Sequence, residues 1–557
     1  MCSFVSPHSN PILPNPSSAC FSNGDSMKGK RQNKPLKTAV LCFLFFAVCM
    51  VAQAFFDGSA GSAASPPPSD LKTARKIRRH VRRDPYRPVY HIVNPEGVGS
   101  APTTDPNFAI YWRGRYHLWH YFVESSDIVS FEHLSSIDLV HWREHEPNRN
   151  IRGKASIPPY QIDAGLSGNA MVNKQGQVTI GFGMPLRGFG LAFSDDPLLE
   201  KWTNLPENPV VSQQKMSANG SWDGIVKFAH WDPFVWLEEG TYYMISGGFP
   251  NTKPYPDKPA LFKSENLTDW SYVGPFMTRE MPGVAPEEDI SCADFFEMGG
   301  KHVLLCISHK RGCRYYVGEW KNEQFHPEAH YRMCWSHPND PEFFAPESLL
   351  TSDGRRVMWA WVRPTLPSEM KKQAGWAGML SLPRHIWMGE NNRLHMCPVD
   401  ELDQLRYNPV EIERRPVSSL YVLPGVSGRE LELGINIEPG DAKRVGVKVC
   451  RSPDGEEETS IYYDAQKKKL VVDTSKSGLK YTQTEEAPFE LKPGELLRLR
   501  IFVDHSVVEV YANDRQAIVR RIYPTYNDST GVAVFAEGGL AKLKASKGWK
   551  MAASNPY

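Results

Sequence analysis

Three short acidic segments are the candidates for chemistry in this chain of 557 residues. Asp105 and Asp232 each precede a proline, and Glu287, Glu288 and Asp289 form an acidic triplet. Carboxyl groups can act as nucleophiles and as proton donors. Taken alone, an aspartate before a proline is usually a turn cap, and an acidic triplet is usually solvated loop charge. The elements that position these residues therefore decide between the two interpretations.

Those elements are expected to be strands. The chain has 42 glycines and 45 prolines, and long helical periodicities are scarce, which favours an all-β protein rich in turns. Its length predicts two domains and a tail. The formal net charge of +1 gives the chain no overall excess of positive charge, which argues against nucleic-acid binding. No Cys/His spacing is typical of zinc, and we expect neither a metal nor a cofactor.

An internal repeat predicts the architecture of the middle of the chain. A polar turn is followed each time by a tryptophan, and these tryptophans lie 60 and 68 residues apart: Trp142, Trp202 and Trp270, with a fainter copy at Trp320. The segment from residue 90 to 400 holds about five such periods, as expected for blades of a β-propeller. We expect the polar side chain to cap the turn and the indole to seal the space between neighbouring blades.

The pattern of apolar and polar residues changes near residue 409. Strands such as 430–437 and 497–503 alternate apolar and polar residues and are separated by short polar turns. This pattern is typical of a two-sheet sandwich. The sequence therefore predicts an all-β protein with a five-bladed β-propeller over residues 87–405, followed by a C-terminal β-sandwich over residues 406–557.

The N-terminal region predicts attachment to a membrane. A basic tail, residues 1–37, precedes the apolar run 38–56, whose 19 residues would extend about 28 Å as a helix. Either a signal anchor or a cleaved signal peptide fits this run. Residues 57–86 follow as a disordered basic stalk, which is either a processing site or simply solvated. These features predict a secretory-pathway protein, either anchored in the membrane by the N-terminal helix or secreted after processing.

Two further sequence features bear on that localisation. The triplets at Asn219, Asn266 and Asn527 fit a glycoprotein, although such triplets often arise by chance. Six cysteines lie beyond the tail and the apolar run, too few for a disulfide scaffold. One bridge, such as Cys306–Cys313, is compatible with the spacing.

Ordered motifs carry a family resemblance from about residue 90 to the C-terminus. They are Thr104-Asp105-Pro106-Asn107-Phe108, Leu166-Ser167-Gly168-Asn169-Ala170, Trp231-Asp232-Pro233, Ser291-Cys292-Ala293-Asp294-Phe295-Phe296, Leu380-Ser381-Leu382-Pro383-Arg384 and Phe502-Val503-Asp504-His505-Ser506. In this order they resemble glycoside hydrolase family 32, which contains invertases, inulinases and levanases. The resemblance implies a glycosidase that cleaves fructosyl linkages in sucrose, fructan or a related glycan by a retaining, two-carboxylate mechanism.

The resemblance also implies roles for individual residues. Asp105 corresponds to the nucleophile that attacks the anomeric carbon. Asp232 corresponds to the carboxylate that holds sugar hydroxyls and stabilises the transition state. Asn107, Ser167 and Trp231 are expected to contact the substrate.

The proton donor is where this sequence departs from the family. Ser291 stands at the position of the family's acid/base glutamate, and a hydroxyl cannot donate a proton near neutral pH as a carboxylic acid can. Asp289 lies two residues upstream, on the same side of a strand, and is the first candidate to replace it. Glu288 would serve if the register slipped by one. Glu347, on a later strand, is expected near the cleft either as the acid or as a substrate-binding residue, and the site could also lack an acid altogether.

Other departures affect the sugar pocket. Trp231 replaces an arginine, and an indole can only stack or donate one N–H. Residues 102–104 replace a segment that contains an aromatic side chain in the family. His230, beside Asp232, either replaces part of the lost positive charge or is structural. A fructosyl hydrolase is the favoured function, while a fructosyl-transferring enzyme and a non-catalytic sugar-binding propeller stay open.

Overall fold

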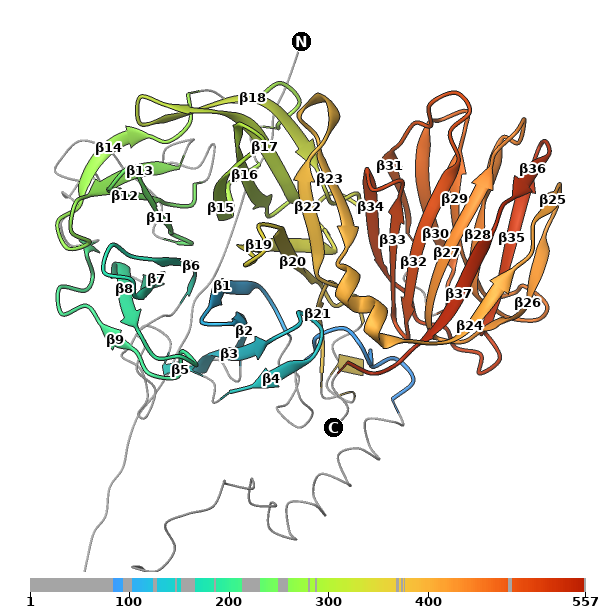
Figure 1. The fold of residues 1–557 in the computed structure, drawn as a ribbon, viewed down its shortest axis with the longest axis horizontal. Helices are drawn as coiled ribbons and strands as arrows, with labels where there is room; N and C mark the ends of the chain where they lie inside the picture. The colour runs from blue at the N-terminus through green and yellow to red at the C-terminus, as the bar shows by residue number, and fades with distance from the viewer. Residues whose placement is uncertain are drawn as a thin grey trace, which may run out of the picture. The chain divides into compact units, whose positions relative to one another are not determined.

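The described part of the chain folds mainly into strands (Figure 1). The computed structural model describes residues 84–93, 103–123, 128–145, 148–151, 166–184, 187–212, 231–248, 259–278, 281–285, 288–366, 370–371, 374, 376–478 and 483–554. Short 3-10 segments interrupt the strands at η2 (Glu390–Asn392) and η3 (Asp400–Leu405). The all-β prediction is confirmed.

The described strands between residues 106 and 398 form five antiparallel sheets of four or five strands. The first sheet contains β1 (Pro106–Trp112), β2 (Arg115–Val123), β3 (Ile128–Ser136), β4 (Trp142–Glu144) and β5 (Asn148–Ile151). The second contains β6 (Leu166–Val172), β7 (Val178–Met184), β8 (Gly188–Ser194), β9 (Thr203–Asn204) and β10 (Val211–Ser212). The third contains β11 (Phe234–Glu238), β12 (Thr241–Ile245), β13 (Ala260–Ser264) and β14 (Ser271–Pro275).

The fourth and fifth sheets complete a ring. The fourth contains β15 (Ser291–Met298), β16 (Lys301–Ser308), β17 (Gly312–Lys321) and β18 (Gln324–Arg332). The fifth contains β19 (Phe343–Leu350), β20 (Arg356–Val362), β21 (Met379–Leu380), β22 (Arg384–Met388) and β23 (Leu394–Pro398). The first strands of the sheets contact one another in the cyclic order β1, β6, β11, β15, β19 and back to β1, around the common axis seen in Figure 1. This is the predicted β-propeller, and its sheets agree in number with the five expected blades.

The internal repeat forms the same turn after the third strand of each of the first three sheets. Its leucine adopts a left-handed backbone, with φ of 65° at Leu139, 54° at Leu199 and 69° at Leu267. The serine that opens the turn accepts the N–H of the residue two positions on, at 3.1–3.2 Å. The tryptophan three residues after the leucine donates its indole N–H to the leucine carbonyl, at 2.7–3.2 Å. The predicted polar cap is present in each turn.

The tryptophans of the repeat also contact neighbouring sheets. Trp142 of the first sheet meets Trp359 of the fifth edge to face, with ring centroids 5.8 Å apart. Trp202, which follows the second sheet's turn, meets Trp119 of the first sheet at 6.0 Å. These contacts seal the spaces between blades as predicted. The fainter copy differs, because Trp320 lies inside β17 rather than after a turn.

The described strands from residue 406 onward form two sheets that pack as a β-sandwich. One contains β24 (Arg406–Ile412), β25 (Arg415–Val417), β27 (Glu430–Glu438), β32 (Leu497–Asp504), β33 (Val507–Ala512), β34 (Gln516–Arg521), β36 (Ala541–Leu543) and β37 (Ser546–Met551). The other contains β26 (Tyr421–Ser427), β28 (Arg444–Arg451), β29 (Glu458–Asp464), β30 (Lys469–Lys476), β31 (Thr484–Pro488) and β35 (Gly531–Glu537). Inward-facing aliphatic side chains fill the core between them. The sandwich prediction is confirmed.

A buried polar network joins residues 84–93, the last propeller sheet and the sandwich. Asp504 accepts the N–H groups of residues 89–91 at 2.8–3.0 Å and contacts His91 Nδ1 at 2.8 Å. Burial would lower the pKa of His91, but its hydrogen bonds to Asp504 and Glu509 raise that pKa to about 9. Glu509 also pairs with Arg384 of β22 at 3.0 Å.

The predicted secretory, membrane-anchored localisation is corrected. Across the ranges that the structure describes, no helix has the length and apolar character needed to cross a membrane. The apolar run 38–56 on which the prediction rested lies outside those ranges, as do the tail 1–37 and residues 57–83 of the stalk. Glycosylation of the Asn-x-Ser/Thr triplets stays a prediction.

The Cys306–Cys313 bridge that the spacing allowed is not formed, and this expectation is also corrected. The six cysteines of the described ranges are free thiols. Cys313 pairs with Ile307 across β16 and β17, so Cys306 lies one residue out of register. Because successive strand residues face opposite sides of a sheet, the two thiols point away from each other.

Candidate active site

Asp105 and Asp232 lie at the starts of two innermost strands. Asp105 directly precedes β1, and Asp232 lies two residues before β11. Burial and the nearby charge of Asp232 raise the pKa of Asp105 to about 7. Burial also raises the pKa of Asp232. The fold therefore brings the two predicted carboxyl groups close enough for their charges to interact.

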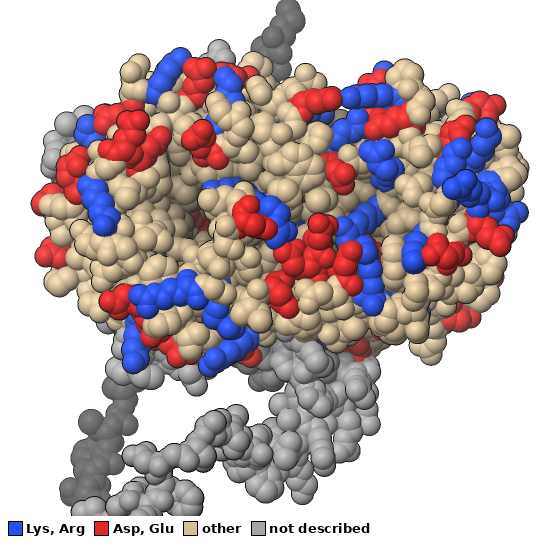
Figure 2. Space-filling view, viewed as in Figure 1, with Lys and Arg blue, Asp and Glu red and all other residues tan. Residues whose placement is uncertain are grey.

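Irregular strand starts direct side chains into this region. The register shifts near the beginning of β1, β15 and β19, and each shift contains a non-glycine residue with positive φ: Phe108 (51°), Cys292 (46°) and Ala345 (46°). Asp232 itself has φ of 48°. Such conformations are uncommon outside glycine, and bulges redirect the side chains beside them. The blades thus share one feature that presents their strand starts to a common site. On the face drawn in Figure 2, acidic and basic side chains are interspersed.

The backbone of β15 holds Asp232 in place. The N–H of Cys292 donates to Oδ2 of Asp232 at 3.1 Å, and the Cys292 thiol lies 3.6 Å from the same oxygen. These bonds oppose the effect of burial on the pKa of Asp232 because they favour its ionised form. The fourth blade therefore fixes a carboxylate that belongs to the third.

Asn107 lies two residues after the nucleophile candidate, and both ends of its side-chain amide are bonded to the protein. Its amide nitrogen donates to the carbonyl oxygen of Asp105 at 2.8 Å, and its amide oxygen accepts the N–H of Gly168 at 3.2 Å. A Cβ at Gly168 would lie 1.8 Å from the carbonyl oxygen of Gly181, so this position requires glycine. Asn107 thereby fixes the turn that carries Asp105 and links β1 to β6. Substrate contact by Asn107 and by the buried Ser167 stays a prediction.

Two of the divergent residues contact each other. Trp231 donates its indole N–H to Oγ of Ser291 at 2.9 Å, and that hydroxyl donates to Oδ2 of Asp289 at 2.9 Å. Gly247 provides space for the indole, because a Cβ there would lie 2.3 Å from Nε1 of Trp231. Trp231 is therefore one end of a hydrogen-bonded chain that runs into the fourth blade.

Asp289 holds His309, a residue that the sequence analysis did not identify. Nδ1 of His309 lies 2.5 Å from Oδ2 of Asp289, and the backbone N–H of His309 donates to Oδ1 at 2.8 Å. Burial would raise the pKa of Asp289, but the bonds and charge of His309 lower it. Burial would lower the pKa of His309, but Asp289, Asp232 and Asp105 raise it. These directions favour an imidazolium at His309 paired with a carboxylate at Asp289.

Glu288 is held by two arginines and has a structural role. Its buried carboxylate pairs with Arg314 at 3.1 Å and with Arg332 at 2.7 Å. Burial would raise its pKa, but these arginines and the N–H of Ala285 lower it to about 2. A carboxyl group that stays ionised at every working pH is a poor proton donor.

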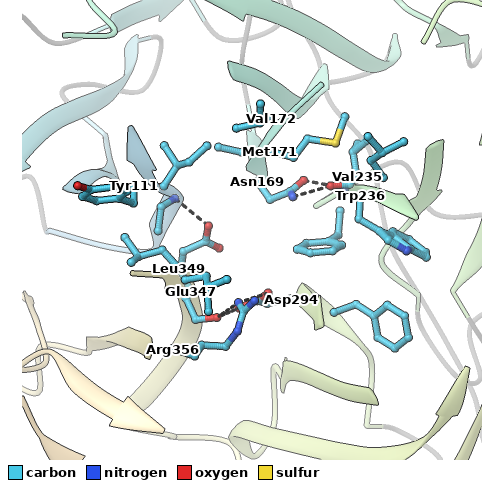
Figure 3. A pocket seen from close by; sticks show the side chains of 18 residues that line it. Tyr111, Asn169, Met171, Val172, Val235, Trp236, Asp294, Glu347, Leu349 and Arg356 are labelled. Atoms are coloured by element: carbon cyan, nitrogen blue, oxygen red, sulfur yellow. Dashed lines mark hydrogen bonds and ion pairs between the residues drawn. The ribbon is translucent and has the colours of Figure 1, made fainter. Parts of the chain in front are cut away.

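Glu347 lies elsewhere, in a pocket of about 430 Å³ lined by the first strands of all five sheets (Figure 3). Its Oε1 accepts the N–H of Ala109 at 3.0 Å. Burial and the charge of Asp294 raise its pKa well above the usual range. The charges that act on Asp105 come instead from Asp232, His309 and Arg363. The described contacts of Glu347 are thus with Ala109 and the charge of Asp294, and its predicted roles stay predictions.

The segment before Asp105 is only partly described. Thr103 and Thr104 are buried, and the N–H of Thr103 donates to the carbonyl of Ala377 at 2.8 Å. His230 lies outside the described ranges. Within those ranges no group of three or more His, Cys, Asp or Glu side chains is arranged to hold a metal ion. The chemistry available from the described side chains is nucleophilic attack by a carboxylate and proton transfer by an imidazole or carboxyl group.

Comparison with known proteins agrees with this arrangement. Residues 101–398 match the Glycosyl hydrolases family 32 N-terminal domain, and residues 401–550 match the Glycosyl hydrolases family 32 C-terminal domain. A sucrose-6-phosphate hydrolase of Zymomonas mobilis is 26% identical over 521 residues, which cover 86% of this chain and 95% of the relative. A levanase of Bacillus subtilis is 27% identical over 509 residues, which cover 83% and 69%.

Solved structures show the same fold. Fructan 1-exohydrolase IIa from Cichorium intybus superposes with a TM-score of 0.71 at 22% identity, covering 85% of this chain and 98% of that one. Sucrose-6-phosphate hydrolase from Lactobacillus gasseri superposes with a TM-score of 0.67 at 21% identity, covering 87% and 97%. With both domains matched in the order in which the propeller and the sandwich occur, this chain belongs to glycosyl hydrolase family 32.

Proposed function

We propose that this protein is a glycosidase that hydrolyses fructosyl linkages in sucrose, fructan or a related saccharide, with retention of configuration. Its relatives bear the names sucrose-6-phosphate hydrolase, levanase and invertase. The observation that carries the proposal is the convergence of Asp105 and Asp232, whose charges interact at the starts of two innermost strands. A retaining glycosidase needs a carboxylate nucleophile beside the bond that it breaks, and a second carboxylate next to it can hold the sugar in place for the attack.

Asp105 is the nucleophile in this proposal. Its carboxylate attacks the anomeric carbon of the fructosyl unit and forms a covalent intermediate, which water then hydrolyses. Because the pKa of Asp105 is raised to about 7, a large part of it is protonated and inactive below that pH. The nearby charges of His309 and Arg363 favour the ionised form that attack requires.

Asp232 binds and orients the sugar. The N–H of Cys292 fixes one of its carboxylate oxygens, so the carboxylate can receive sugar hydroxyls without first being ordered. Trp231 offers the same pocket an aromatic face in place of the family's arginine, and stacking on a sugar ring replaces paired donors. We expect this substitution to change which saccharide binds.

The test is release of fructose by the full-length chain from sucrose, inulin and levan. Asp105→Asn removes the nucleophile and should lower kcat by a factor on the order of 10³ or more. A fructosyl adduct on the peptide that contains Asp105, found by mass spectrometry after rapid quenching, would support the covalent step. Saccharide binding without release of fructose from any of the three substrates would instead favour a non-catalytic sugar-binding propeller. Accumulation of longer saccharides at high sucrose would favour fructosyl transfer.

A further inference from the structure

We propose that His309 is the general acid and base of this site, and that Asp289 is the positioning residue that holds it. This inference rests on the fructosyl hydrolysis proposed above, because that reaction needs a proton donor. Ser291 cannot supply one, and the structure shows Glu288 tied to two arginines. His309 occurs in the same blade as Ser291, directly after the strand that pairs with the strand of Ser291.

The register of the β15–β16 hairpin brings Asp289 and His309 together. Ser291 pairs with Ile307, and two residues beyond this pair on each side Asp289 is bonded to His309. The side chain of Asp289 is 1% exposed and that of His309 is 53% exposed. A buried carboxylate therefore holds an imidazole whose ring reaches the surface of the site.

The groups around His309 come from four blades. Three carboxylates act on it, from the starts of β15, β11 and β1: Asp289, Asp232 and Asp105. Phe344 of β19 packs against the imidazole edge to face, with centroids 5.7 Å apart. Arg363, just after β20, lies over the ring of Phe344 at 5.4 Å and is the cation on that side. Three anions facing one cation favour the protonated imidazole, which is the form that an acid must have before catalysis.

Asp289 is suited to orient the imidazole and unsuited to donate the proton itself. It accepts hydrogen bonds from the backbone N–H of His309, from Nδ1 of His309 and from Oγ of Ser291. All of these bonds stabilise the carboxylate. With Nδ1–H bound to Asp289, Nε2–H carries the proton that can be transferred.

Asp105, His309 and one water molecule account for every bond and proton in the two chemical steps. In the first, a carboxylate oxygen of Asp105 bonds to the anomeric carbon, the bond from that carbon to the leaving oxygen breaks, and the leaving oxygen takes the proton from Nε2 of His309. In the second, neutral His309 accepts a proton from a water molecule whose oxygen attacks the anomeric carbon and releases Asp105 as the carboxylate. The sum is one bond hydrolysed and one water consumed, with the imidazolium restored.

Two fructosides separate proton donation from nucleophilic attack. Sucrose needs a protonated leaving group, whereas nitrophenyl β-fructofuranoside leaves as an anion without help. In His309→Gln we expect kcat on sucrose to fall by a factor of about 10²–10⁴. The same variant should still release nitrophenol, and added azide should accelerate this by attacking the fructosyl intermediate to give fructosyl azide. Asp289→Asn should move the alkaline limb of kcat/KM to lower pH by about one unit or more, because the imidazolium loses its anion.

Controls and outcomes separate this inference from the proposed function. His337→Gln changes an exposed histidine in another loop and should leave both rates unchanged, and circular dichroism of each variant checks folding. Wild type that cleaves the nitrophenyl substrate but neither sucrose nor fructan would overturn His309 as donor and leave Asp105 as nucleophile. Full sucrose activity and an intact alkaline limb in His309→Gln would also overturn it. A wild-type protein that cleaves none of the fructosides would reject the proposed hydrolase function and, with it, the role of His309 as its acid.

Discussion

The indole N–H of Trp231 donates to Oγ of Ser291 at 2.9 Å, so the two residues that the sequence motifs predict to stand in place of the family's arginine and glutamate are bonded to each other. Gly247 leaves space for the indole, and the hydroxyl of Ser291 donates a hydrogen bond to the carboxylate of Asp289. The two departures are therefore parts of one rearrangement that ends at His309.

This contact predicts that substitutions at the two positions are coupled. Ser291→Glu alone places a second buried carboxylate beside ionised Asp289, and we expect it to lower the free energy of unfolding by about 1–3 kcal/mol. Adding Trp231→Arg supplies a cation and should recover part of that loss while raising sucrose hydrolysis. Urea unfolding and sucrose kinetics of both single variants and the double variant form the cycle. Strictly additive effects would contradict the coupling.

Asp105 is predicted to limit stability at high pH. Its pKa is about 7 in the fold and 3.8 in a model peptide, so the folded state holds a proton that the unfolded state has lost between those values. The stability contributed by this proton is present at low pH and is lost as pH rises through the folded pKa. Asp105→Asn should therefore raise the free energy of unfolding by about 2–4 kcal/mol above neutral pH, and by little near pH 4.

Thermal unfolding at several pH values checks this sign. Asp195→Asn removes an exposed carboxylate from the second sheet's turn and is the matched control, with little change expected. A gain from Asp105→Asn that stayed constant across the pH range would show that the effect does not come from titration of Asp105.

A buried stack of histidines in the first blade is predicted to make the fold acid-sensitive. The ring of His133 stacks on those of Trp119 and His145, at centroid distances of 4.0 and 4.3 Å, and its Nε2 lies 3.0 Å from Nδ1 of His117. Burial lowers the pKa of all three histidines, to about 3 for His117. Below about pH 6.5 the unfolded chain therefore binds protons that the fold cannot, and each depressed histidine costs up to about 1.4 kcal/mol per pH unit.

Replacing one member of the stack should flatten this dependence. His133→Phe keeps an aromatic ring between its neighbours and removes a titrating group, so the midpoint of thermal unfolding should fall less between about pH 7 and pH 5 than in wild type. His337→Phe, at an exposed position, serves as the comparison. An unchanged slope in His133→Phe would mean that other groups cause the loss.

The network around Asp504 is predicted to stabilise the whole fold. Asp504→Ala leaves three backbone N–H groups and a buried imidazolium without their acceptor, and we expect a loss of about 3–5 kcal/mol. Because the pKa of His91 is raised to about 9, the stability that its pairing contributes is present near neutral pH and is lost as pH rises through that value. Denaturant unfolding of Asp504→Ala beside the exposed control Asp528→Ala measures the difference. Equal stability of the two variants would refute this role.

Local patterns were sufficient to predict the architecture. Two-residue alternation predicted the sandwich, and the spacing of tryptophans predicted the blades, because both features reflect contacts that recur along the chain. The repeat even predicted the sealing role of Trp142 and Trp202, whose rings reach the neighbouring sheet. The Asp105 and Asp232 pair was identified from motifs rather than from periodicity.

His309 was missed because its position depends on one irregularity. The turn at Gly299 and Gly300 pairs Met298 with Lys301, and an unbroken hairpin would place residue 310 opposite Asp289. The bulge between Ser291 and Asp294 shifts the pairing by one residue and brings His309 there instead. A bulge of this kind depends on the other blades around it, so the strand sequence alone does not reveal it.

The surroundings of Glu347 also depend on its position along the strand, which the sequence does not reveal. Its strand was identified correctly, but a residue's distance from the strand start decides whether it faces Asp105 or the pocket along the axis. Glu347 is the fifth residue of β19, whereas Asp105 precedes β1. Burial, Asp294 and the N–H of Ala109 therefore define its surroundings.

The hairpin of β15 and β16 carries Ser291, Asp289 and His309 on one continuous piece of chain, while the nucleophile candidate belongs to another blade. The proposed proton donor and the nucleophile therefore belong to different blades of the propeller. Natural variation within about twenty residues can retune the pH range or the preferred leaving group without disturbing Asp105. Exchanging this single hairpin between homologous propellers is accordingly a compact route to redesigning such enzymes.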